Sequence, residues 1–299
     1  MVHFGQMTRI EQFGWRGDVE PGIGRVVSAH GDYYHLVCNE QQTGEILARK
    51  KKSAFLRMKT VAPVNMKGKK ISEVRAELPP QPLTGDFVRF RYNAQGESMI
   101  TEVLPRFSHF ERKDPTAKRT SQTLAVNFDT LFVMMSLNEN FSTARIRRYL
   151  DLAQDMGAAE VVVVVTKVDL RQDGDEEFFD ELREEVGDAA RILEISSLTG
   201  EGMEQVNEYV KPGKTLAFIG SSGVGKSTLL NTLMGEEWQA TQEIQEWSGK
   251  GRHTTTSREL VMLPSGAMVI DTPGIREIGM VGEMDDLQAK GESTHRWRK

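Results

Sequence analysis

The chain has few of the features that a secreted or membrane protein needs. Cys38 is the only cysteine among 299 residues, so no disulfide can form within the chain and no cysteine-based zinc site can be assembled from it. The longest apolar runs, such as residues 161–165, are far too short to span a membrane. No basic region followed by an apolar stretch and a small-residue cleavage site opens the sequence, so no signal peptide is expected. A cytoplasmic protein is predicted.

Charge is unevenly distributed along the chain, although the net charge is only −5. Basic side chains are dense between residues 49 and 119, and acidic side chains gather in residues 173–185. A locally basic first part indicates a polyanionic partner such as RNA. A solvated surface of mixed charge is the alternative explanation.

The first part of the sequence predicts a small β-barrel. Short strands with turn signals between them are typical of such barrels, and they are expected at residues 25–28, 33–37, 45–48, 87–92 and 99–104. An OB-like barrel over residues 1–105 would suit an RNA partner, because that fold often binds nucleic acid. The first 20 residues are expected to be irregular, and the proline-containing stretch 53–82 is expected to be a long loop.

Residues 106–123 are polar and basic, and we interpret them as a linker between domains. Strands and helices then alternate over residues 124–282, which predicts an α/β domain with a mostly parallel sheet. Residues 283–299 form a short polar tail. The expected strands are 130–135, 161–165, 191–195 and 216–219, with a strand pair at 259–263 and 267–270, and the expected helices are 144–156, 176–186 and 203–210.

A glycine-rich segment dominates this second domain and matches the P-loop pattern G-x-x-x-x-G-K-[S/T]. It lies between a predicted strand and a predicted helix, the context in which the pattern indicates phosphate binding. Backbone N–H groups and the helix N-terminus would face the phosphates, Lys226 would reach the β- and γ-phosphates, and Ser227 would coordinate Mg²⁺. A simple glycine-rich turn before a helix is the alternative. The segment comprises Gly220, Ser221, Ser222, Gly223, Val224, Gly225, Lys226, Ser227 and Thr228.

Two downstream segments fit a nucleotide that carries a γ-phosphate. Asp271 follows a strand directly and can hold Mg²⁺ through water, and the Gly274 amide can contact the γ-phosphate. Between the P-loop helix and that strand lies a run of threonines, in which Thr254 or Thr255 is expected to ligate Mg²⁺ and order a switch loop. The sequence does not decide which threonine is the ligand, and a β-prone threonine run at a strand start is the alternative.

Two upstream segments predict recognition of guanine. Asp169, in the segment Thr166-Lys167-Val168-Asp169, can accept hydrogen bonds from guanine N1–H and N2–H₂, which adenine does not offer, while the stem of Lys167 lies on the base. Ser196 and Ser197 follow the next strand and are expected to supply contacts to the base. In ordinary GTPases the P-loop precedes such segments. The reverse order here predicts a circularly permuted GTPase domain.

The chain resembles the ribosome-small-subunit-dependent GTPase A family (RsgA, also called YjeQ). The resemblance rests on this motif order, on the segments Arg252–Thr256 and Asp271–Glu277, and on the N-terminal barrel. The resemblance runs from about Gly24 to about Gly282. It implies a GTPase that acts in late maturation of the small (30S) ribosomal subunit and is stimulated by that subunit. It also implies that the barrel contacts ribosomal RNA, here 16S rRNA. A monomer is expected.

Two departures from the family pattern affect the expectations. Members usually continue into a zinc domain with three cysteines and a histidine, whereas here Cys38 lies far upstream and His295 is alone in a polar tail. No zinc is therefore expected in this chain, and weaker ribosome docking is expected. Thr166 stands where asparagine is usual, which leaves guanine preference to Asp169.

The hydrolytic step lacks one common participant. Many GTPases place a water-orienting glutamine just after the Asp-x-x-Gly segment, but Ile275 occupies that position and cannot orient water. His253, the one imidazole in a switch segment, is the candidate for that role. Two other functions stay open: an RNA-binding protein whose GTP site hydrolyses weakly, and a P-loop kinase or ATPase, which Asp169 argues against.

Overall fold

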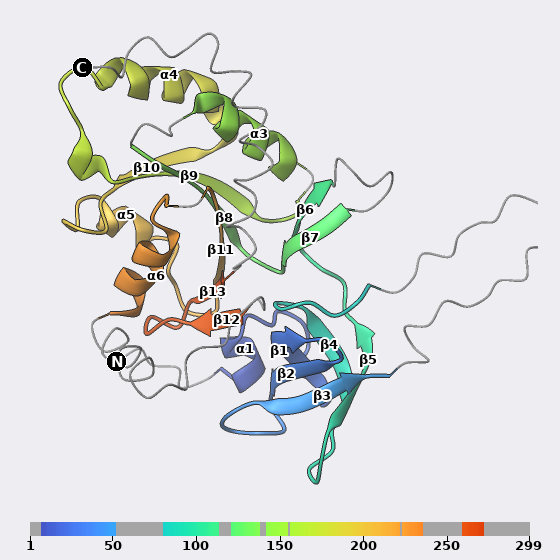
Figure 1. The fold of residues 1–299 in the computed structure, drawn as a ribbon. Helices are drawn as coiled ribbons and strands as arrows, with labels where there is room; N and C mark the ends of the chain where they lie inside the picture. Colours follow the sequence, from blue (N-terminus) through green and yellow to red (C-terminus); the bar gives the residue numbers. More distant parts are fainter. Residues whose placement is uncertain are drawn as a thin grey trace, which may run out of the picture.

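The computed structural model describes residues 7–51, 80–113, 121–137, 142–154, 156–221, 223–235 and 259–271. It contains a five-stranded barrel and an α/β sheet that lies beside it (Figure 1). In the part of the chain that is described, no helix is long and apolar enough to cross a lipid bilayer.

Strands β1 (Ile23–His30), β2 (Tyr33–Cys38), β3 (Ile46–Lys50), β4 (Phe87–Arg91) and β5 (Ser98–Val103) form the barrel. They follow the order β1-β2-β3-β5-β4, and β4 pairs back onto β1 to close the ring. Each strand contributes side chains to the barrel interior. The interior is apolar and includes Val26, Leu36, Ala48, Val88 and Ile100. All five strands expected from the sequence are therefore present.

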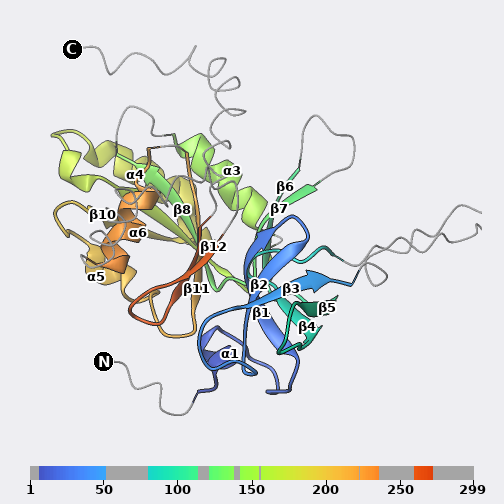
Figure 2. The same ribbon diagram turned by 60° about the horizontal axis from the view of Figure 1, so that its bottom comes forward.

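The α/β sheet contains β8 (Thr130–Ser136), β9 (Glu160–Thr166), β10 (Arg191–Ile195), β11 (Thr215–Ile219), β12 (Glu259–Met262) and β13 (Met268–Asp271). Their order is β10-β9-β8-β11-β13-β12. Neighbours from β10 to β13 pair in parallel, whereas β12 is antiparallel to β13. The sheet continues from β12 into the barrel, since Glu259 of β12 pairs with Ser28 of β1 (Figure 2).

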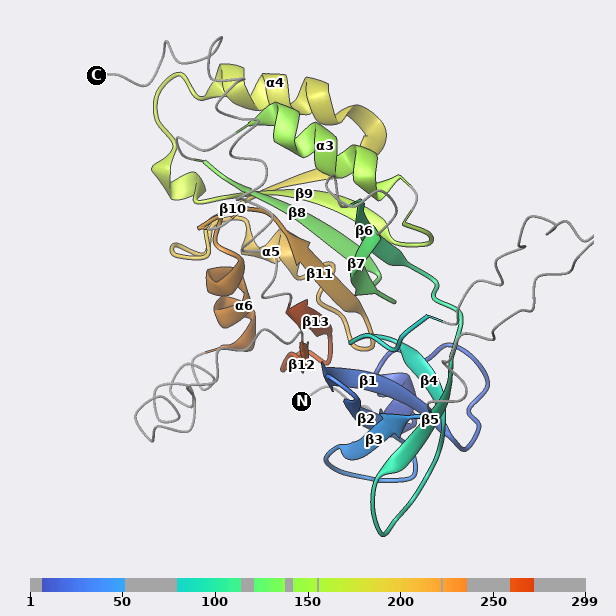
Figure 3. The same ribbon diagram turned by 45° about the vertical axis from the view of Figure 1, so that its right-hand side comes forward.

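Helices cover both faces of this sheet. Helices α3 (Thr143–Ala153) and α4 (Glu176–Val186) lie on one face, and α5 (Met203–Val206) and α6 (Lys226–Met234) lie on the other (Figure 3). Every residue of β8 is buried, as expected of a central strand with helices on both faces. Its odd-numbered apolar side chains join the α3–α4 core, and Phe132 and Met134 join the α5–α6 core.

The first 20 residues and the ends of two helices differ from the sequence expectations. The first 20 residues contain a short helix, α1 (Arg9–Gln12), stabilised by a capping box in which the Thr8 amide donates a 2.7 Å hydrogen bond to the Glu11 carboxylate. Helix α5 ends at Val206 rather than 210, and α3 ends at Ala153 rather than 156. Helix α1 is too short to be predicted from periodicity, because it has only four residues and buries a single side chain, Ile10.

The stretch 106–123, interpreted from the sequence as a linker between domains, contains β6 (His109–Lys113) and the start of β7 (Ser121–Val126), which pair as a separate two-stranded sheet. This hairpin is anchored to the α/β domain: the His109 amide donates a 2.9 Å hydrogen bond to the Met156 carbonyl. Phe110 is buried and is the only large apolar residue of β6, so the sequence shows little sign of a strand there.

A buried arginine joins the barrel to the α/β sheet. Arg25 of β1 is 1% exposed. Its guanidinium donates to the carbonyl of Phe13 at 2.6 Å, to the hydroxyl of Thr215 at 3.0 Å and to the carbonyl of Asn127 at 2.8 Å. It also lies 4.8 Å from the ring centre of Phe87. Burial lowers the pKa of Arg25 to about 9, which still leaves it charged at neutral pH.

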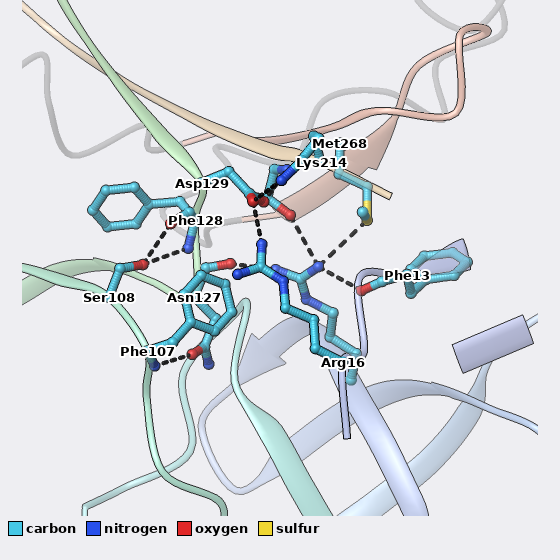
Figure 4. A network of polar contacts seen from close by, with 11 residues as sticks. Phe13, Arg16, Phe107, Ser108, Asn127, Phe128, Asp129, Lys214 and Met268 are labelled. Carbon is cyan, nitrogen blue, oxygen red and sulfur yellow. Dashed lines mark hydrogen bonds and ion pairs between the residues drawn. The ribbon is translucent and has the colours of Figure 1, made fainter. Parts of the chain in front are cut away.

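Asp129 forms the second half of this junction (Figure 4). Its carboxylate accepts hydrogen bonds from the Lys214 ammonium and from the Thr215 amide, both at 2.9 Å, and pairs with Arg16 from the N-terminal segment. Nearby, the Ser108 hydroxyl donates to the Phe128 carbonyl at 2.6 Å. The starts of β8 and β11 are thus held to the barrel side of the molecule by polar contacts.

Candidate nucleotide-binding site

The predicted P-loop lies between β11 and α6, as the sequence predicts. A left-handed backbone begins and ends the turn, with φ of 151° at Gly220 and 92° at Gly225. A Cβ atom at Gly220 would overlap the carbonyl oxygen of Met134 in β8, so only glycine fits there. The close approach packs the loop against the end of the neighbouring strand.

Lys226 lies in the first turn of α6 and folds back over the loop. Its ammonium donates 2.6 Å hydrogen bonds to the carbonyls of Gly220 and Ser221. Positive charge is thereby held at the mouth of the loop, where phosphate oxygens are expected. Ser227 and Thr228 follow on the same helix turn and are exposed, so their hydroxyls are accessible to a ligand.

Thr166 connects the base-reading segment to the P-loop. It ends β9, is buried, and donates its hydroxyl to the Val224 carbonyl at 2.7 Å; its oxygen is also 3.2 Å from the Met135 carbonyl. Lys167 follows with a left-handed φ of 61°, which turns the chain sharply into the 3₁₀ turn η1 (Val168–Leu170). Thr166 therefore contacts the predicted P-loop directly.

Asp169 is exposed within η1 and is oriented by Ser196. The Ser196 hydroxyl donates a 2.5 Å hydrogen bond to Asp169 Oδ1 and accepts from the amides of Leu198 and Thr199 at 3.3 and 3.2 Å. Ser196 is fully buried, whereas Ser197 is half-buried. One serine thus orders the loop after β10 and holds the carboxylate that the sequence assigns to guanine recognition.

These groups share one edge of the sheet. Strands β9, β10, β11 and β13 run in parallel, so the loops after their carboxyl ends lie along the same side, where open α/β sheets bind ligands. Asp271 ends β13, next to the P-loop strand. The predicted site residues Ser222, His253, Thr254, Thr255 and Gly274 lie outside the described residues.

The magnesium expected with a nucleotide fits the oxygens at this edge. Among the described residues there is no group of three or more His, Cys, Asp or Glu side chains that would form an all-protein metal cage. Mg²⁺ at nucleotide sites takes one or two protein oxygens and completes its shell with phosphates and water. The exposed hydroxyl of Ser227 and the position of Asp271 at the end of β13 suit that arrangement.

One contact of the P-loop involves a residue outside the recognised motifs. Arg145, in the first turn of α3, lies with Nη1 3.4 Å from the hydroxyl oxygen of Ser221. No motif indicates it, because Arg145 and Ser221 are 76 positions apart in the sequence. The sheet topology explains the contact. Strands β8 and β11 are parallel neighbours, so the segment after β8 lies beside the P-loop, which follows β11.

The segment that contains these groups matches the family model described as RsgA GTPase over residues 103–281. The chain belongs to the RsgA GTPase family. It is 43% identical over 209 residues to the small ribosomal subunit biogenesis GTPase RsgA of Leptospira interrogans. That match covers 69% of this chain and 57% of the relative, so the chain spans little more than half of the relative's length.

Two solved structures have a similar fold. The crystal structure of YjeQ from Thermotoga maritima matches with a TM-score of 0.58 at 26% identity, covering 86% of this chain and 76% of the other. The crystal structure of YloQ, a circularly permuted GTPase, matches with a TM-score of 0.52 at 22% identity, covering 87% and 74%. The circular permutation predicted from the motif order is therefore the architecture of a structural neighbour.

Proposed function

We propose that this chain hydrolyses GTP to GDP and phosphate and acts in late maturation of the small ribosomal subunit. The observation that carries the proposal is the linkage of the two halves of the site. Thr166 hydrogen-bonds the P-loop, and Asp169 is held by Ser196 at the same sheet edge. The loop proposed to bind phosphate and the carboxylate proposed to bind guanine are thus connected through the short segment from Thr166 to Asp169. The names of the relatives supply the ribosomal context.

Each predicted site residue would have its own role in nucleotide binding or hydrolysis. Asp169 accepts hydrogen bonds from the base, and the stem of Lys167 covers it. Lys226 and the loop amides neutralise phosphate charge as it builds up in the transition state. His253 orients the attacking water in place of the missing glutamine. Ser227, Asp271 and Thr254 or Thr255 would hold Mg²⁺, which screens the negative charge of the β- and γ-phosphates when bound.

The barrel would contact ribosomal RNA. Its surface carries the exposed ring of Tyr33 with the guanidinium of Arg49 stacked 4.2 Å from the ring centre. Tyr33 and Arg49 are cross-strand neighbours in β2 and β3, and Met99 of β5 lies beside Arg49. Aromatic and arginine side chains of this kind stack on unpaired bases. They support a single-stranded RNA partner.

Phosphate release from GTP, measured with and without purified small ribosomal subunits, tests the proposal, with ATP as the control. Slow turnover of GTP that rises strongly with subunits, and no turnover of ATP, is the expected result. GTP turnover that the subunits leave unchanged would remove the ribosomal part. Tight RNA binding with no measurable turnover would favour an RNA-binding protein whose nucleotide site hydrolyses weakly.

A further inference from the structure

Two positive side chains meet at one residue of the P-loop. The Lys226 ammonium is 2.6 Å from the carbonyl oxygen of Ser221, and the Arg145 guanidinium is 3.4 Å from its hydroxyl oxygen. The lysine belongs to the P-loop motif, but the arginine comes from a different helix. Both cations reach the same residue, so a polyphosphate bound at the loop would be attracted by two positive charges.

The position of Arg145 is fixed by its surroundings. Its backbone amide donates to the hydroxyl of Ser142, at 3.3 Å, in the N-cap of α3. The next residue, Ile146, is fully buried in the core beneath the helix. Since the backbone is anchored on both sides, the arginine can reach Ser221 without ordering a loose segment, which lowers the entropic cost of the contact.

Two further contacts connect the described part of the P-loop to the sheet. Thr166 holds Val224 in the second half of the loop, and Met134 packs against Gly220 at its beginning. Arg145 is the contact from α3 to the first half, at Ser221. It thus reaches the loop from α3, whereas Thr166 reaches it from the end of β9.

We propose that Arg145 is a positioning residue for the nucleotide: it holds Ser221 in the P-loop and adds a second positive charge beside Lys226, and so favours the triphosphate over the diphosphate. This inference rests on the proposed function, because it assumes that the loop binds a guanine nucleotide. The triphosphate carries more negative charge than the diphosphate, so the added cation stabilises it more.

The test measures the dissociation constants of two fluorescent probes, the N-methylanthraniloyl derivatives of GDP and of the non-hydrolysable GTP analogue GMPPNP. Arg145→Ala should raise the Kd for the GMPPNP probe about two- to tenfold, the size of one hydrogen bond. It should raise the Kd for the GDP probe less. Arg145→Lys keeps the charge but loses the planar fork, so its effect should be intermediate.

Arg147→Ala is the matched control. Arg147 lies on the same helix, is more than half exposed, and pairs with Asp151 and Glu185 rather than with the P-loop. Its removal should leave both constants unchanged, since exposed ion pairs contribute little. Urea unfolding without nucleotide should give the same midpoint for both variants, which separates positioning from a loss of folding.

A double-mutant cycle with Ser221→Ala tests the route of the effect. If Arg145 acts through Ser221, Arg145→Ala should change the GMPPNP constant less in the Ser221→Ala background than in the wild type. An equal change in both backgrounds would overturn the positioning of Ser221 by Arg145, and no change in either would overturn the whole inference. A wild-type chain that binds neither probe would overturn the proposed function as well, which distinguishes the two failures.

Discussion

The guanidinium of Arg25 donates a 3.0 Å hydrogen bond to the hydroxyl of Thr215, which joins the first strand of the barrel to the strand that leads into the P-loop. The two residues are 190 positions apart. Thr215 also donates its amide to Asp129, at the start of β8. The barrel thus touches the amino ends of the strands whose carboxyl ends carry the candidate nucleotide site.

Replacing Arg25 with methionine should destabilise the whole chain. The change keeps much of the side-chain volume but leaves the carbonyls of Phe13 and Asn127 without this donor in a buried site. The loss is expected to be about 3 kcal/mol, seen as a lower midpoint of urea unfolding. Arg89→Met, at an exposed position of β4, is the control and should change the midpoint little. Equal midpoints for the two variants would contradict a structural role for Arg25.

Removing the Thr166 hydroxyl should weaken nucleotide binding more than folding. Thr166→Val keeps the shape of the side chain but frees the Val224 carbonyl, which lies in the P-loop. The Kd for GTP should rise about fivefold, corresponding to roughly 1 kcal/mol, as measured by calorimetry with a non-hydrolysable analogue. Thr232→Val on the exposed side of α6 makes the same substitution away from the loop and should bind as the wild type does. A larger effect at Thr232 would refute this role for Thr166.

Exchanging the carboxylate of Asp169 for an amide should reverse the base preference. Guanine donates two hydrogen bonds to a carboxylate, whereas xanthine has a carbonyl in place of the amino group and can accept from an asparagine amide. Asp169→Asn should therefore lower GTP affinity on the order of a hundredfold or more and raise XTP affinity. Competition between the two nucleotides measures the ratio. Asp173→Asn, an exposed neighbour, should keep the wild-type preference, and an unchanged ratio at Asp169 would assign base recognition elsewhere.

His253→Ala should separate nucleotide binding from stimulated hydrolysis. If the imidazole orients the attacking water, the variant binds GTP with wild-type affinity but loses at least about a hundredfold in subunit-stimulated turnover. The affinity measurement is the control, because a general loss of the site would change both quantities. Stimulated turnover at the wild-type rate would exclude this role for His253.

The thiol of Cys38 should be unreactive in the folded chain. It is 1% exposed, and burial raises the pKa of Cys38 to about 11. At pH 8 only about 0.1% of such a thiol is the reactive thiolate, against roughly a quarter for an unperturbed cysteine. Reaction with Ellman's reagent should be at least about a hundredfold slower in buffer than in denaturant, and the native rate should rise with pH. A single fast phase in buffer would show that the barrel core is open.

Features encoded by local pattern are predictable from this sequence. The P-loop is recognisable because its glycines, its lysine and the flanking strand and helix are contiguous, and the structure confirms the strand–loop–helix arrangement around Lys226. The apolar run at residues 161–165 likewise predicts a central strand, which is β9. In both cases the local pattern contains all the information that the prediction requires.

Features that depend on distant partners are not predictable in this way. In the sequence, Arg25 is one of many basic residues in the first domain. Its burial depends on carbonyls and a hydroxyl that distant segments supply, as far away as Thr215. Thr166 reads as a weaker substitute for asparagine near the base, whereas its hydroxyl reaches the Val224 carbonyl. Such roles emerge from tertiary contacts rather than from periodicity.

The position of β12 and β13 has a consequence for the order of events during synthesis. These strands lie between β11 and the barrel strand β1, yet they are encoded after all the other strands that the structure describes. Until residues 259–271 are made, one edge of β11 lacks its final partner, and an unpaired strand edge can pair with another chain. The first barrel strand and a much later strand thus become neighbours, so this sheet is completed only once the ribosome has released residues 259–271.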